Sequence, residues 1–158
     1  MFGFFKKGLE LVAPVSGNAV DLSQVPDPVF SQKMAGDGLA IEATGDTAVA
    51  PCDGTITLIF KTNHAFGMQL DNGVELLIHI GIDTVELNGE GFERLIEEGS
   101  KVKAGTPIIK FNREFIKEKG LSLSTPVLVT NVDVVKELTP SIGKQVSAGK
   151  DIVLTIKK

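Results

Sequence analysis

The chain has 158 residues, 42% of them hydrophobic and 23% charged, which is enough for one domain with its own apolar core. The net charge is −4 and no block of basic residues occurs, so nucleic acid is not expected as a partner. No apolar run approaches the roughly 18 residues of a membrane-spanning helix. One cysteine, Cys52, excludes an internal disulfide and fits a reducing cytoplasm.

Two segments are predicted along the chain, a tail over residues 1–11 and a single domain over residues 12–158. The tail carries Phe2, Phe4 and Phe5 ahead of two lysines, a composition suited to weak contact with an anionic membrane surface. A terminus that is frayed or packed against the domain explains the same residues, and we favour that alternative.

Short apolar runs rich in Val and Ile, separated by turn residues, follow one another through the domain. Examples are GLAI, GTITLIF, TPIIKF and DIVLTI at residues 38–41, 54–60, 106–111 and 151–156. Many short strands at this spacing predict an all-β fold of the sandwich or barrel type. A few short helices are expected, over residues 91–99, over residues 113–119 after an Asn112 cap, and over residues 134–138 before Pro140.

Two sequence elements occur twice. VAPVSG at residues 12–17 returns as VAPCDG at residues 49–54, and GSKVKAGTPI at residues 99–108 returns as GKQVSAGKDI at residues 143–152. Two copies of each element predict two interlocked β units related by pseudo-symmetry. The repeated glycines are expected in turns, and the repeated Val and Ile in the core.

The only two histidines bracket a predicted hairpin that turns at Asp71-Asn72-Gly73. Asn-Gly between apolar runs is a strong hairpin signal. A two-residue loop at Asn72-Gly73 sets His64 and His79 diagonally on one face, and a loop at Asp71-Asn72 sets them directly opposite. Only an odd-length loop or a bulge would separate them. The sequence therefore predicts two neighbouring imidazoles.

Two neighbouring imidazoles have the chemistry needed to carry a phosphoryl group. A neutral imidazole is nucleophilic at cytoplasmic pH, and a second one can donate an N–H to a phosphoryl oxygen. The donor ring needs a partner on its other nitrogen, a role suited to the hydroxyl of Thr62 for His64. The carbonyl of Gly81 is the corresponding candidate for His79. Either histidine alone would be weak support for a site.

Zinc binding is the alternative use of the same pair, with Asp83 as a third ligand and a zinc-dependent hydrolase of lysostaphin-like architecture as the function. A catalytic zinc ordinarily has three protein ligands. The lysostaphin-type peptidases use His-x-x-x-Asp and a His-x-His pair. Here Met68 stands four residues after His64, and no His-x-His occurs. We therefore rank this alternative below phosphoryl transfer.

Several short motifs match one family. They are APxxG, PDxVF, GDG and TNHA at residues 13–17, 26–30, 36–38 and 62–65, and above all GVELLIHIGIDTV at residues 73–85. With these motifs the chain, from about Val12 onward, resembles the glucose-type enzyme IIA of the bacterial phosphoenolpyruvate-dependent sugar phosphotransferase system. The resemblance implies an antiparallel β-sandwich, a cytoplasmic location, phosphate received from the small carrier HPr, and transfer to the IIB domain of a sugar permease.

Carried over position by position, the resemblance implies roles for three site residues. His79 is the phosphoryl acceptor through Nε2, His64 orients and stabilises the phosphoryl group, and Thr62 holds the tautomer of His64. The resemblance also implies an apolar docking face with an acidic rim. The apolar positions are Val29, Phe30, Ala35, Phe60, Phe66, Leu77 and Val85, and the rim positions are Asp27, Asp83 and Glu86.

The resemblance requires no cofactor, although a zinc ion at His64 and His79, completed by a partner's carboxylate, has precedent in the family. Regulatory partners that recognise the unphosphorylated form are also known there. Many members are the C-terminal domain of a permease, whereas this chain starts at Met1 shortly before the match begins. We therefore expect a free-standing protein, with a domain excised from a longer permease as the alternative.

Overall fold

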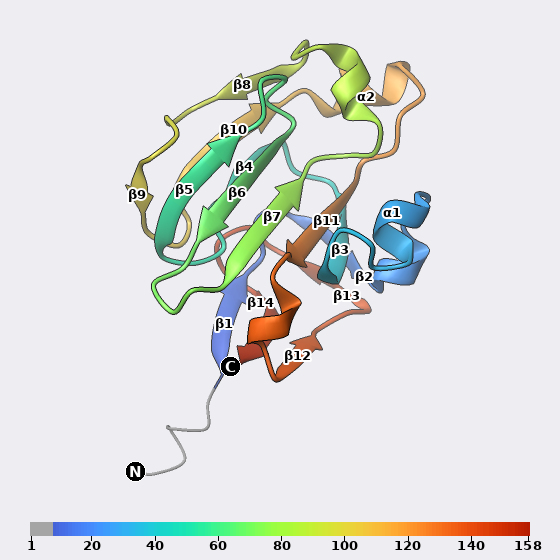
Figure 1. Cartoon of the computed structure of the whole chain (residues 1–158). Helices are drawn as coiled ribbons and strands as arrows, with labels where there is room; N and C mark the ends of the chain where they lie inside the picture. Colours follow the sequence, from blue (N-terminus) through green and yellow to red (C-terminus); the bar gives the residue numbers. More distant parts are fainter. Residues whose placement is uncertain (1–7) are drawn as a thin grey trace.

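β-Strands make up most of the regular structure, as a computed structural model that describes residues 8–158 shows (Figure 1). The strands are β1 (Leu9–Val12), β2 (Gly17–Val20), β3 (Asp37–Ala43), β4 (Thr47–Val49), β5 (Gly54–Ile59), β6 (Ala65–Gln69), β7 (Glu75–His79), β8 (Phe92–Arg94), β9 (Lys101–Val102), β10 (Pro107–Phe111), β11 (Ser124–Val129), β12 (Glu137–Pro140), β13 (Lys144–Val146) and β14 (Ile152–Lys157). The helices are α1 (Pro28–Ser31), α2 (Arg113–Glu118) and the 3-10 helices η2 (Leu22–Gln24), η3 (Thr84–Leu87) and η4 (Val132–Val134). The predicted all-β fold with a few short helices is confirmed.

All paired strands run antiparallel and form three sheets. The largest has eight strands in the order β13-β2-β3-β11-β7-β6-β5-β9, and two smaller sheets have the orders β1-β14-β12 and β4-β10-β8. Figure 1 shows β4, β10 and β8 toward the top of the molecule and β1, β14 and β12 toward the bottom. One large apolar core packs residues from all three sheets together. The antiparallel β-sandwich implied by the resemblance is thereby confirmed.

The internal duplication is visible in matching hydrogen bonds between the two copies of the first repeat. The N–H of Val12 donates to the carbonyl of Pro51 at 2.9 Å, and the N–H of Val49 donates to the carbonyl of Pro14 at 2.7 Å. The two copies of the second repeat also occupy matching places. They contain β9 and β13, which pair with β5 and β2, the strands that begin at the last glycine of each copy of the first repeat. The predicted pair of interlocked, pseudo-symmetric β units is confirmed.

One of the three predicted helices is confirmed. The side chain of Asn112 accepts a hydrogen bond from the N–H of Phe115 at 3.1 Å and caps α2. Gly120 follows the helix with a φ of +77°, a conformation that glycine adopts without steric cost. Capping residues at both ends therefore gave the correct prediction.

The helices predicted over residues 91–99 and 134–138 are wrong. Residues 92–94 form β8, which pairs with β10, and residues 137–140 form β12, which pairs with β14. Helices of this length are marginal on their own. Residues 92–94 and 137–140 instead each complete a three-stranded sheet, so tertiary pairing overrides local preference.

A second, smaller core holds α1 beside the large sheet. It packs apolar side chains of η2 and α1 against the large sheet and against Ile82. Its buried members are Leu22, Val25, Phe30, Ala40, Ile82 and Leu128. The side chain of Asp27 accepts a hydrogen bond from the N–H of Val29 at 2.9 Å and caps α1. This core brings α1 next to the C-terminal end of β7.

Within residues 8–158, no helix is long and apolar enough to cross a membrane. The membrane contact considered for Phe2, Phe4, Phe5 and the two lysines after them falls on residues 1–7. It lies outside the described residues.

Gly17→Ala should lower the free energy of unfolding by about 2–3 kcal/mol. Gly17 begins β2, and a Cβ at this position would overlap the carbonyl oxygen of Glu42 on the neighbouring β3. Gly67→Ala is the matched control, because a Cβ there meets nothing closer than 3.5 Å. Urea unfolding should show the control unchanged or slightly stabilised. Equal losses for both variants would contradict this account of the repeat glycine.

Candidate functional site

The β6–β7 hairpin has a register that differs from both predicted ones. Ala65 pairs with His79, which requires an odd number of loop residues, and residues 71–73 form that loop. An odd loop exchanges the two faces of β6 relative to β7. Phe66 therefore points into the core and is 0% exposed. The prediction that Phe66 lies on an accessible docking face is therefore wrong.

The two histidine rings meet nevertheless, because His64 lies just before the first residue of β6. Asn63 has a φ of +57°, a left-handed conformation that turns the chain out of the strand. The carbonyl of His64 accepts a hydrogen bond from the N–H of Ile80 at 2.8 Å. The ring centroids of His64 and His79 lie 4.8 Å apart, with the ring planes at 82°. The imidazoles are neighbours through this turn and not through the expected strand register.

The Nδ1 atom of each ring has a hydrogen-bond partner. His79 Nδ1 lies 2.7 Å from the carbonyl oxygen of Gly81. A carbonyl oxygen only accepts hydrogen bonds, so Nδ1 of His79 carries the proton and Nε2 of the neutral ring is left with a free lone pair. His64 Nδ1 lies 2.6 Å from the hydroxyl oxygen of Thr62. When that hydroxyl donates to Nδ1, the His64 ring carries its proton on Nε2.

Burial keeps both rings neutral. Burial and, to a smaller extent, the neighbouring His79 lower the pKa of His64 to about 4. Burial also lowers the pKa of His79, although the carbonyl of Gly81 and the negative charges of Asp27 and Asp83 oppose this effect. A neutral pair of imidazoles at neutral pH offers one nucleophilic nitrogen and one N–H donor.

Two phenylalanine rings pack against the histidine pair. The Phe30 ring centroid lies 5.0 Å from that of His79, and the Phe60 centroid lies 5.2 Å from that of His64. His64 is 2% exposed and Phe30 is 6% exposed, whereas His79 and Phe60 are half-buried. His79 is therefore the ring that a visiting group reaches. Phe30 supports that ring from below rather than lining an open surface.

The other apolar residues expected on the docking face are at least partly exposed. Val29 and Val85 are 43% and 50% exposed, and Ala35 and Leu77 are half-buried. Leu77 shares the outer face of β7 with His79, since the two are separated by one residue.

The three acidic residues expected at the rim also lie near the surface. Asp83 and Glu86 are exposed and Asp27 is half-buried. Asp83 has a left-handed backbone conformation, and its side chain makes no capping hydrogen bond to η3. Its carboxylate is therefore not used by the helix that follows it.

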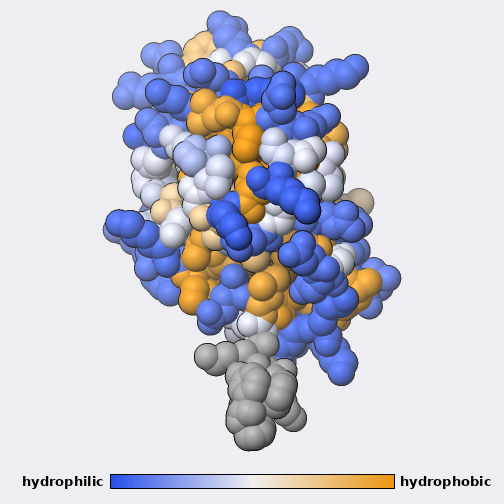
Figure 2. Space-filling model, turned by 90° about the vertical axis from the view of Figure 1, so that its left-hand side faces the viewer, coloured by the Kyte–Doolittle hydropathy of each residue, from blue (hydrophilic) through white to orange (hydrophobic). Residues whose placement is uncertain are grey.

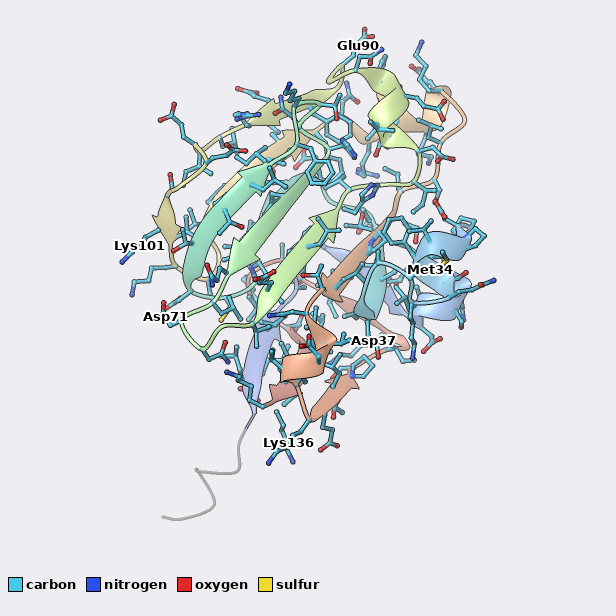
Figure 3. The ribbon with its side chains drawn as sticks, in the orientation of Figure 1. Met34, Asp37, Asp71, Glu90, Lys101 and Lys136 are labelled. Carbon is cyan, nitrogen blue, oxygen red and sulfur yellow. The ribbon has the colours of Figure 1, made fainter. Side chains whose placement is uncertain are left out.

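The structure adds two apolar surface residues that the sequence argument missed. Met34, 69% exposed, follows α1 (Figure 3), and its N–H donates to the carbonyl of Val29 at 3.0 Å. Leu58 on β5 is 48% exposed and lies beside Gly67 at the rim of a hollow of about 360 Å³ that Leu77 also lines. Neither residue belongs to a motif, so only the folded neighbourhood reveals them.

Apolar exposure alone does not define the site. Figure 2 shows the face at the left of Figure 1, where hydrophobic side chains form patches between hydrophilic ones. The histidine pair distinguishes one region from the other exposed surface, and it lies where β7 ends at His79. Figure 3 places Asp71 at the tip of the β6–β7 hairpin, at the far end from the arrowhead of β7 and thus away from this pair.

The zinc hydrolase alternative finds no support. Among residues 8–158, no group of three or more His, Cys, Asp or Glu side chains is arranged to hold a metal ion. His64, His79 and Asp83 therefore do not form the three-ligand site that a catalytic zinc needs. Two imidazoles alone do not fit a resident zinc.

Comparison with known proteins agrees with the fold. The family model for the phosphoenolpyruvate-dependent sugar phosphotransferase system, EIIA 1, matches residues 9–135. The glucose-specific EIIA component of Haemophilus influenzae is 46% identical over 95% of this chain and 90% of that protein. The one of Borreliella burgdorferi is 42% identical over 98% of this chain and 97% of that protein. The solved glucose permease IIA of Mycoplasma capricolum has a TM-score of 0.88 and 38% identity, covering 96% of this chain and 97% of its own.

A β-sandwich with two adjoining histidines, the outer of which is half-buried, thus falls into a class of phosphoryl-carrying proteins. The chain belongs to the EIIA 1 family of the phosphoenolpyruvate-dependent sugar phosphotransferase system. It is a phosphocarrier of that system, which makes it a phosphotransferase component.

Burial of His64 should make the free energy of unfolding fall as the pH drops from 6.5 towards 4. The pKa of His64 is about 4 in the folded protein against 6.5 for a free ring, so between these values the unfolded state binds a proton that the folded state does not. The contribution of neutral His64 to the free energy of unfolding is complete above pH 6.5. About 2–3 kcal/mol of it is lost as the pH falls to 4. Urea unfolding at both ends of this window measures it. His64→Gln should lose distinctly less stability, and an equal loss would refute the assignment.

Proposed function

We propose that this chain accepts a phosphoryl group from phospho-HPr on Nε2 of His79 and passes it to the IIB domain of a sugar permease. The observation that carries the proposal is the 2.7 Å hydrogen bond between His79 Nδ1 and the carbonyl of Gly81. It holds the proton on Nδ1, so the lone pair on Nε2 is available for attack on phosphorus. Family membership supports the same role.

In the proposed step, Nε2 of His79 attacks the phosphorus atom of the donor. The new P–N bond forms on His79 as the P–N bond to the donor histidine breaks, and the electron pair of the broken bond returns to the donor nitrogen. Transfer to the acceptor on IIB runs by the same in-line displacement. Nε2 carries no proton, so the attack needs no base. The phosphorylated ring keeps its proton on Nδ1 and is an imidazolium, whose N–H remains bonded to the carbonyl of Gly81.

His64 is proposed to stabilise the transferred group. Its ring lies 4.8 Å from that of His79, centroid to centroid, close enough for an N–H on Nε2 to reach a phosphoryl oxygen. Thr62 supports this role when its hydroxyl donates to Nδ1 at 2.6 Å. A donor held in place in advance stabilises the charge that develops on the equatorial oxygens during transfer.

The surface around His79 is proposed as the docking face for both partners. Val29, Val85 and Met34 offer apolar side chains at 43%, 50% and 69% exposure. Such a face excludes water from the phosphoryl group, and its modest area suits weak, fast exchange. The carboxylates of Asp27 and Asp83 favour a partner with a basic face and speed its approach.

Residues 12–158 are proposed to act as one domain in the cytoplasm, where HPr would meet them. Val12, the last residue of β1, pairs with Ile152 of β14, so the start of this segment is tied to its C-terminal strand. Sugar specificity is inferred to reside in the permease, because His79 exchanges phosphate only with proteins. The relatives named above are glucose-specific components, so a glucose-type permease is the first acceptor to test.

Incubation with phosphoenolpyruvate, enzyme I and HPr should give an acid-labile, base-stable phosphoprotein. His79→Gln should abolish labelling, because the acceptor nitrogen is lost. His64→Gln should still accept phosphate from HPr yet pass it on poorly, because orientation and charge stabilisation are lost. Thr62→Val should slow transfer by on the order of tenfold, as when a ring loses the partner that fixes its tautomer. Full labelling of the His79→Gln variant would overturn the proposed acceptor.

The docking face predicts that a charge introduced at Val85 weakens partner binding. Val85→Asp should raise the KM for phospho-HPr by about tenfold, which corresponds to roughly 1.4 kcal/mol, and leave kcat nearly unchanged. Val132→Asp is the matched control. Val132 is 44% exposed, and the neighbouring Asn131 bonds Glu75 at the opposite end of β7. Steady-state transfer assays measure both variants, and a KM shift of equal size in the control would count against this face.

A further inference from the structure

The chain between β7 and η3 is held at three consecutive peptide units. The N–H of Ile80 donates to the carbonyl of His64 at 2.8 Å, and the N–H of Ile82 donates to the carbonyl of Ser122 at 3.1 Å. Between these two peptides, the carbonyl of Ile80 accepts a hydrogen bond from the hydroxyl of Thr84 at 2.6 Å. Among residues 8–158, the side-chain groups that bond the backbone of this turn are thus the Thr84 hydroxyl and the Nδ1–H of His79 itself.

The turn has little room to change its conformation. Gly81 has a φ of +76°, and a Cβ at this position would lie 2.6 Å from Cγ2 of Thr84 and 2.8 Å from the carbonyl oxygen of Ser122. The carbonyl of Gly81 belongs to the peptide whose N–H bonds Ser122. That carbonyl is the acceptor for His79 Nδ1. The direction of the Gly81 carbonyl therefore depends on the bond from Ile82 to Ser122. It also depends on the packing around Gly81 and on how the preceding Ile80–Gly81 peptide is held.

Thr84 lies in the right place to hold that peptide. The carbonyl of Ile80 and the N–H of Gly81 form one rigid peptide plane, and Thr84 bonds that plane from a fully buried position, 0% exposed. A valine would fill the same volume, so packing alone does not require the hydroxyl. The methyl group of Thr84 meanwhile faces Gly81. Both branches of one side chain thus act on the glycine that orients His79.

We propose that Thr84 is a positioning residue: its hydroxyl fixes the Ile80–Gly81 peptide so that the Gly81 carbonyl keeps the proton of His79 on Nδ1. The proposal deepens the proposed function and rests on it, because a fixed Nδ1–H tautomer matters for catalysis only if Nε2 accepts phosphate. Thr84 acts through Gly81 and touches no reacting atom.

The test compares Thr84→Val with wild type by ¹⁵N chemical shifts of the histidine ring nitrogens at neutral pH. Wild type should show His79 almost entirely as the Nδ1–H tautomer. Thr84→Val leaves the Ile80 carbonyl without its donor, so a measurable Nε2–H fraction should appear and phosphoryl acceptance from phospho-HPr should slow by about tenfold. Thr84→Ser retains the hydroxyl and should restore both the tautomer and the rate to within about twofold of wild type.

A matched control separates positioning from stability. Thr125 is also 0% exposed, and its hydroxyl donates to the carbonyl of Leu123 at 3.0 Å, so it holds neither Ile80 nor Gly81. Thr125→Val should lower the melting temperature and leave the His79 tautomer unchanged. A folded Thr84→Val with a wild-type tautomer, or the same tautomer shift in Thr125→Val, would overturn the proposal.

If Thr84→Val does not fold, Thr84→Cys takes its place, because a thiol is a weaker donor of similar size. Its Nε2–H fraction should then lie above that of wild type and of Thr84→Ser, and an unchanged fraction would refute the proposal. The tautomer measurement needs no phosphate. It therefore remains readable if wild-type His79 fails to label, a result that would reject the proposed function and not the positioning by Thr84.

Discussion

A proton held on one side of one ring determines the chemistry of this site. The carbonyl of Gly81 accepts a hydrogen bond from Nδ1 of His79, so the lone pair of the neutral ring is on Nε2. Burial supports this arrangement, because it lowers the pKa of both His64 and His79 and keeps the pair uncharged. The carbonyl, in turn, points the right way only because the chain leaves β7 through a glycine with a positive φ.

The scaffold suits exchange between proteins better than capture of a small molecule. Antiparallel pairing on both sides of β7, with β6 and β11, gives a rigid support, and the second core fixes α1 beside it. The proposed acceptor nitrogen of His79 therefore belongs to a ring at the end of a rigid strand. Val29 and Val85 expose apolar side chains, and under the proposed function a partner covers them during transfer and leaves afterwards.

The hairpin shows how sequence reasoning reached a correct contact through a wrong register. Alternation along two strands predicted that the rings of His64 and His79 would meet, yet the three-residue loop puts Ala65 opposite His79. The rings meet because Asn63 turns the chain out of the strand. Phe66 lies within β6, follows the strand register and points into the core. The helix predictions over β8 and β12 were wrong for a related reason, because partner strands distant in sequence decided the conformation of these segments.

The sequence by itself determined the all-β class, the duplicated units, the capped helix α2 and the identity of the histidine pair with Thr62, because these depend on local patterns and on motifs. Tertiary structure alone decided the hairpin register, the second core beneath α1, the exposure of Met34 and Leu58, and the anchoring of the Gly81 turn by Thr84. Loop parity, burial and backbone direction arise from contacts between residues far apart in the chain. A linear pattern carries little of that information.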